Sequence, residues 1–244
     1  MSKFKTILLT APAIMIAAAL FSCGGSGTKK TGDSTAAGGT DTTKKAAPAA
    51  AMAAPFDVVD VRHDVKDYDK WRPVFDADST NRKAAGGQDL AVGRDADSPN
   101  SLLVVVKVSD MAKARAMMAD PKLKATMDKA GVISKPDIMF YHVIRFGGNP
   151  RAKQFMVVNH KVKDFNAWLK VFDGEGPAKR SSEGFNDIAL ARGIDDTTMV
   201  HLAFEVTDLA KAKAAIMSGD KKKLMMSAGV IGKPDIHFYN NTAK

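Results

Sequence analysis

The sequence predicts an α+β protein built from two copies of one small βαββαβ unit. The motif His-x-Val-x-Asp-(Tyr/Phe)-x-x-Trp at residues 63–71 recurs at 160–168, and Ala-Gly-Val-Ile at 130–133 recurs at 228–231. The spacing is 97 residues at the first pair and 98 at the second, so the copies run in register. Self-similarity at a constant period is typical of a repeated structural unit.

The first copy opens with alternating apolar and polar residues over 57–65, which predicts a strand. Apolar residues at helical spacing then predict a helix over 67–84. The Gly-Gly pair at 86–87 ends this helix before a strand at 90–94, and a turn leads to a strongly apolar strand at 102–108.

Capping residues mark the second half of this copy. Asp110 is a suitable N-cap for a helix over 112–119, Pro121 restarts a helix that Gly131 ends, and the last strand covers 138–144. The second copy repeats this order from Gln154, with Asp208 as the cap. The order is that of a ferredoxin-like sandwich, whose antiparallel sheet carries both helices on one face.

The opposite face of each sheet is half apolar and needs a cover. In the strand at 102–108 this face carries Leu103, Val105 and Lys107, and in the equivalent strand of the second copy it carries His201 and Ala203. We therefore expect the domains at 56–146 and 153–244 to pack sheet to sheet as a pseudo-dimer within one monomeric chain.

The N-terminus predicts a bacterial lipoprotein. A basic start and a short apolar run form a signal peptide over 1–22, and the run ends at Leu-Phe-Ser before Cys23, which is the only cysteine. Residues 23–55, rich in Gly, Ser, Thr, Ala and Lys, predict a lipidated, disordered tether that holds the domains at a membrane of the cell envelope, outside the cytoplasm. The alternative is an ordinary secretory signal or an anchor helix.

The net charge of +9 does not indicate nucleic-acid binding. Part of it lies in the signal peptide and tether, and the remaining lysines are scattered along helix faces without interleaved aromatic residues. The expected partners are the membrane, through the lipid on Cys23, and a small-molecule ligand.

The repeated motif, with the Val-Phe-Asp that follows it and the Ala-Gly-Val helix end, resembles the dimeric α+β barrel superfamily over about residues 56–240. This superfamily includes antibiotic-biosynthesis-monooxygenase-like domains. The resemblance implies a barrel, formed here within one chain. It implies no single activity, because the superfamily holds cofactor-free oxygenases, haem degraders, isomerases and proteins with no known reaction.

His63 and His160 occupy equivalent places near the end of the first strand of each copy. Either is a candidate base or ligand contact, although their apolar neighbours favour a structural role. Trp71 and Trp168 have the spacing of core residues. His201 and His237, which the first copy lacks, form the most site-like polar group together with Asn159, Lys161 and Tyr239; its alternative is a polar lining between the domains.

Four arginines recur in equivalent pairs and are candidates to clamp an anionic ligand. The alternative for each is an ion pair with nearby acids such as Asp95, Asp97, Asp195 or Asp196. Two tyrosines on the last strands complete the ligand-binding candidates. These six residues are Arg82, Arg180, Arg94, Arg192, Tyr141 and Tyr239.

Motifs for other chemistries are missing from the sequence. It contains no Cys-x-x-Cys, His-Glu-x-x-His, phosphate loop after a strand or Gly-x-Ser-x-Gly, so we expect no metal and no cofactor. Two functions remain: a tethered, non-enzymatic binding or structural module with a ligand between its sheets, or a cofactor-independent monooxygenase-like enzyme that uses a cavity histidine as base.

Overall fold

The computed structural model describes residues 55–242, so the predicted signal peptide, Cys23 and nearly all of the predicted tether lie outside the described residues. The strands are β1 (Phe56–Asp64), β2 (Gly87–Asp95), β3 (Ser101–Val108), β4 (Asp137–Phe146), β5 (Gln154–Val162), β6 (Phe185–Gly193), β7 (Met199–Val206) and β8 (Val230–Asn241). The helices are α1 (Tyr68–Ala77), α2 (Ser79–Ala84), α3 (Met111–Met118), α4 (Pro121–Lys129), α5 (Phe165–Glu175), α6 (Pro177–Ser182), α7 (Leu209–Ile216) and α8 (Gly219–Ser227). The predicted α+β class is confirmed.

The eight strands form one closed antiparallel barrel in the order β1-β3-β2-β8-β5-β7-β6-β4. Strands β1 to β4 are neighbours in the order 4-1-3-2, and β5 to β8 repeat that order as 8-5-7-6. Two ladders join these groups, β2 with β8 and β4 with β6. The half-apolar sheet faces are thereby covered, because closure turns them into the interior of the barrel.

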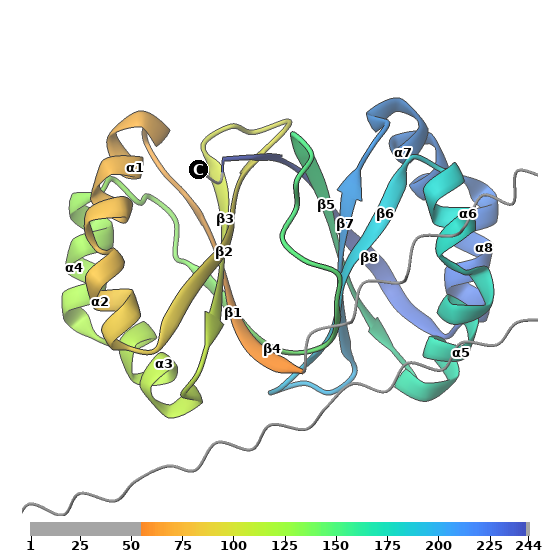
Figure 1. Ribbon diagram of the computed structural model, residues 1–244, viewed down its shortest axis with the longest axis horizontal. Coiled ribbons are helices and arrows are strands. Elements are labelled where there is room, and N and C mark those ends of the chain that lie inside the picture. The colour runs from red at the N-terminus through yellow and green to blue at the C-terminus, as the bar shows by residue number, and fades with distance from the viewer. Residues whose placement is uncertain (1–54, 243–244) are drawn as a thin grey trace, which may run out of the picture. The chain divides into compact units, whose positions relative to one another are not determined.

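The helices cover the outside of the barrel in two layers. Helices α1 to α4 lie on one side and α5 to α8 on the opposite side (Figure 1). The first layer packs on Val59, Val61, Leu102 and Val104 around the buried Trp71, and the second packs on the matching strand residues around Trp168. Both tryptophans are thus core residues, as their spacing indicated.

Local sequence explains where the helices begin and break. Asp110 and Asp208 cap α3 and α7 by accepting hydrogen bonds from backbone N–H groups, as predicted. The predicted single helix over 67–84 was wrong, because the chain breaks at Asp78 into α1 and α2; the Asp78 side chain accepts from the side-chain amide of Asn81 instead of capping a backbone N–H. At the equivalent break Gly176 adopts a φ of 78° and Pro177 starts α6.

One end of the barrel is filled with apolar side chains. Phe155, Val157 and Leu103 pack together there, and the connecting segment between β4 and β5 lies against them through Asn149 and Pro150. The free space left at this end is about 50 Å³. His201 also borders this space, whereas Asp60 and Arg62 line a separate cleft.

Candidate functional site

The candidate site is centred on Asp60 inside the barrel. Strand alternation directs Val59 and Val61 toward the helices, so Asp60 and Arg62 face the interior from β1. Asp60 is only 2% exposed. A carboxyl group so deep in a barrel requires an explanation from its surroundings.

His201 of β7 reaches Asp60 across the barrel. Its Nδ1 lies 3.4 Å from Oδ2 of Asp60 and 2.9 Å from Oδ1 of Asn159, the residue paired with it on β5. The His201 ring packs on the ring of Tyr141, with 4.7 Å between centroids. Burial and the positive charge of Arg62 lower the pKa of His201 to about 3, so the imidazole is neutral at physiological pH.

The Asp60 carboxyl group has no hydrogen-bond partner on either oxygen within the described residues. Burial raises its pKa from 3.8 to about 7, and the nearby Arg62 only partly opposes this shift. Asp60 therefore divides between carboxylic acid and carboxylate at neutral pH. It can donate or accept a hydrogen bond.

Arg62 begins a chain of charged groups across the barrel mouth. Its Nη1 donates to Asp235 of β8, whose other oxygen lies 2.9 Å from Nε2 of His237. Nδ1 of His237 lies 2.9 Å from Asp95 of β2. The pKa of Asp235 is lowered by its bonds to His237 and Arg62, and the pKa of His237 is raised by Asp235 despite partial burial. Nη2 of Arg62 is buried without a partner among the described residues.

A cleft of about 400 Å³ opens above this group. Its lining combines the polar groups with apolar side chains, chiefly Asp60, Arg62, Tyr141, Met139, Met199 and Ile231. The cleft therefore offers both a polar floor and a surface for an apolar body, a combination typical of small-molecule sites.

The sequence-predicted histidines fall in different places. His201 contacts Asp60 and Asn159, and His237 binds Asp235 in the charged chain. His63 lies on the helix side only, whereas His160 borders the cleft and also packs against the helix layer. Their rings pack against Trp71 and Trp168 with centroids 5.6 and 5.5 Å apart. Neither ring has a hydrogen-bond partner among the described residues, and burial lowers both pKa values to about 4.

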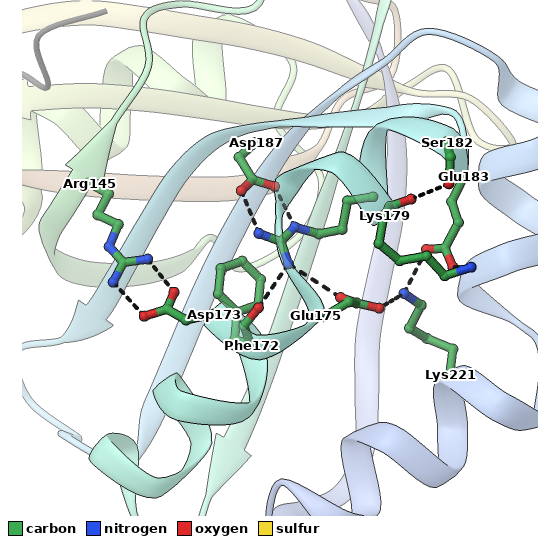
Figure 2. A network of polar contacts seen from close by, with 10 residues as sticks. Arg145, Phe172, Asp173, Glu175, Lys179, Ser182, Glu183, Asp187 and Lys221 are labelled. Atoms are coloured by element: carbon green, nitrogen blue, oxygen red, sulfur yellow. Dashed lines mark hydrogen bonds and ion pairs between the residues drawn. The ribbon is translucent and has the colours of Figure 1, made fainter. Parts of the chain in front are cut away.

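Arg180 is held in a structural network (Figure 2). It donates two hydrogen bonds to Asp187, at 2.6 and 2.7 Å, and one to the carbonyl oxygen of Phe172, at 2.9 Å. Glu175 joins Arg180 to the buried Lys221 in the same network. Arg82 makes the equivalent contacts to Asp89 and to the carbonyl of Phe75. Both guanidinium groups are engaged within the protein.

The second arginine pair also has internal partners. Arg94 and Arg192 donate to the carbonyl oxygens of Pro99 and Thr197, and each lies over an aromatic ring. The acids that were considered as their partners form ion pairs with other residues; these acids are Asp95, Asp97, Asp195 and Asp196. Of the tyrosines, Tyr141 lines the cleft, whereas Tyr239 stacks on Phe155 deeper in the barrel.

Sequence reasoning missed Asp60, Arg62 and Asp235. The first two had a local signal, since they are the charged residues in the middle of a valine-rich strand and share the face opposite His63. Asp235 had no signal of this kind. Its role depends on Arg62, which the barrel brings to it from a distant strand.

Features of two other classes are missing from residues 55–242. No group of three or more His, Cys, Asp or Glu side chains in residues 55–242 is arranged to hold a metal ion. In the same part of the chain no helix has the length and apolar character required to cross a membrane.

No family model and no curated protein matches this chain. Solved structures match over most of it. An anthrone oxidase-like protein aligns with a TM-score of 0.54 and 13% identity, covering 77% of this chain and 92% of its own. A proposed monooxygenase from Lactobacillus acidophilus aligns with a TM-score of 0.52 and 12% identity, covering 78% of this chain and 95% of its own. A heme-binding protein from Thermus thermophilus aligns with a TM-score of 0.51 and 8% identity, covering 79% of this chain and 94% of its own.

At these identities the likeness concerns the fold. Together with the closed antiparallel barrel and its two helical layers, it shows an α+β barrel fold shared with these structures. All eight strands of the barrel come from this one chain.

Proposed function

We propose that this protein is a membrane-tethered bacterial lipoprotein whose barrel binds a small organic molecule in the cleft above Asp60. The single observation that carries the binding proposal is the set of buried polar atoms on Asp60 and Arg62 that have no partner within residues 55–242 and lie in the lining of a 400 Å³ cleft. Buried polar atoms are costly unless they are hydrogen-bonded, and a ligand would supply the missing partners.

We interpret the barrel as two tandem ferredoxin-like domains that form an intrachain pseudo-dimer. The repeated motifs and the repeated strand order, 4-1-3-2 and 8-5-7-6, support this interpretation. Closure of the barrel within one chain also removes the need for a second subunit, which favours a monomer.

The tether is proposed from the sequence alone. A short basic start, an apolar run and a lone Cys23 at its end are typical of a lipoprotein signal. The low-complexity segment that follows gives the barrel reach from the membrane. The proposed location is the cell envelope, with the globular part outside the cytoplasm.

The alternative, a cofactor-independent enzyme with a cavity histidine as base, has weaker support. A general base works best with a pKa near the operating pH, and the pKa of His201 is lowered to about 3. His160 borders the cleft, but burial lowers its pKa to about 4, and His63 lies on the helix side of its strand. These observations weaken a histidine base, so the binding function is the proposed one.

Native mass spectrometry of the purified protein tests the binding proposal. We expect a mass excess that is lost on denaturation, and we expect it to be missing from Met139→Trp, in which a large ring fills the cleft. Val74→Trp, in the cavity between helices and sheet, is the matched control. An excess that survives in Met139→Trp but not in the control would place the ligand on the helix side and contradict the proposal.

A further inference from the structure

The repeat supplies an internal comparison for the Asp60–His201 pair. Asp60 lies between Val105 and Met139 in its ladders, and the equivalent residue of the second half, Val157, lies between Ala203 and His237. The position equivalent to His201 is Leu103. The barrel therefore contains the same cross-barrel position twice, once with an acid and a histidine and once with valine and leucine.

The apolar pair shows what the fold requires at this position. Val157 and Leu103 are 1% and 0% exposed and belong to one hydrophobic cluster. An acid and a histidine at the equivalent place are desolvated, and neither oxygen of the acid is hydrogen-bonded within the described residues. Replacement of such a pair by apolar residues of similar volume is often neutral or stabilising. The polar pair is thus not needed for packing, and the site exists at one end of the barrel.

The groups without partners define what a ligand must present. Nη2 of Arg62 can only donate a hydrogen bond, whereas the Asp60 carboxylate accepts one. Both residues face the same side of β1, two positions apart, so one planar group with an acceptor and a donor can meet both.

The charges of the cleft disfavour an anion. Arg62 is already neutralised by Asp235, and Lys161 pairs with Asp196 at 2.8 Å. The exposed Asp137 and Lys233 at the rim offset each other. An ionised Asp60 would repel a carboxylate, but it would accept a hydrogen bond from a neutral N–H group.

The side chains that line the cleft indicate what the rest of the ligand is. Tyr141, Met139 and Met199 line the cleft, and thioether and aromatic side chains pack well against a flat ring. We propose that the cleft binds one neutral aromatic carboxamide per chain, with the amide N–H on Asp60 and the amide carbonyl on Arg62. This inference rests on the proposed binding function and names its ligand class.

Benzamide and benzoate are the probes, because they have the same size and differ in charge. Titration of the full protein at about pH 8, followed by NMR of the methionine methyl groups, measures affinity and locates each probe. We expect benzamide to bind once per chain, about tenfold more tightly than benzoate, with shifts at Met139 and Met199. Benzoate binding as tightly as benzamide would overturn the inference.

Two variants test the recognition itself. Asp60→Val with His201→Leu copies the apolar pair, and it should fold and lose about tenfold in benzamide affinity. Asp60→Asn keeps the shape and a carbonyl acceptor but removes the charge, so the difference in affinity between benzamide and benzoate should become smaller. Asp220→Asn, at a carboxylate that is 98% exposed and lies outside the cleft lining, is the matched control and should leave the affinity difference between benzamide and benzoate unchanged. If Asp60→Asn leaves this affinity difference unchanged, the proposed role of Asp60 in recognising the ligand is contradicted.

The outcomes separate this inference from the proposed function. If a native ligand is lost in Met139→Trp but benzamide binds no more tightly than benzoate, or if benzoate shifts Met139 and Met199 as strongly as benzamide does, binding stands and the carboxamide class fails. If neither probe shifts these residues and no native ligand is lost in Met139→Trp, both fail.

Discussion

Removal of the Asp60 charge should stabilise the protein at neutral and alkaline pH. The folded state raises the pKa of Asp60 from 3.8 to about 7, so it holds a proton that the unfolded chain releases. Stability must therefore fall as pH rises between these two values. Asp60→Asn has no proton to lose and should not show this fall.

The structure sets the size of the effect. A shift of about 3 pKa units corresponds to about 4 kcal/mol of unfolding free energy, since each unit is worth about 1.4 kcal/mol. We expect Asp60→Asn and the wild type to be similar near pH 4. Near pH 8 the variant should be more stable, by up to about 4 kcal/mol.

Urea unfolding of both proteins over a pH series measures this difference. His63 and His160 pack against Trp71 and Trp168 and titrate in both proteins, so their effects cancel when one stability curve is subtracted from the other. A difference that stays constant from pH 4 to pH 8 would refute the reasoning. So would a wild type that gains stability over the variant as pH rises, because Asp60 would then be an ionised partner of Arg62.

Three further predictions follow from other parts of the chain. Burial lowers the pKa of His63 and His160 from 6.5 to about 4, so stability is lost as pH falls between these values. His63→Leu or His160→Leu should each recover up to about 3 kcal/mol of unfolding free energy at pH 4, measured by urea unfolding. A variant as sensitive to acid as the wild type would contradict this prediction. Arg180→Ala should lower the unfolding free energy by about 2–3 kcal/mol, because it removes a buried guanidinium that bonds Asp187, Glu175 and the Phe172 carbonyl. Arg192→Ala should cost about 1 kcal/mol, and equal losses would count against the network. Cys23→Ser should move the protein from the membrane fraction to the soluble fraction and abolish labelling by a radioactive fatty acid, and an unchanged distribution would exclude lipid anchoring through Cys23.

Much of the scaffold could be predicted from local sequence. Alternation in the 102–108 strand identified the residues that pack under the helices, because successive side chains of a strand point to opposite faces. Asp110 and Asp208 marked helix starts, because their short carboxylates satisfy the free N–H groups of a first turn. The interruption at Asp78 was missed, since no glycine or proline stands at this break to announce it.

The candidate site depends on contacts that local sequence does not encode. Asp60 and His201 belong to strands that are not neighbours in the barrel, and they meet only because the β2–β8 and β4–β6 ladders close it. His63 was the more conspicuous residue in the sequence, yet closure leaves it on the helix side and brings Asp60 into the interior. By itself the sequence determined the elements, their faces and the repeat, because these follow from short-range periodicity and capping. Only the tertiary structure decided that Asp60 and His201 meet inside the barrel and that Asp60 lines a cleft, because that depends on side chains from opposite walls of a closed barrel.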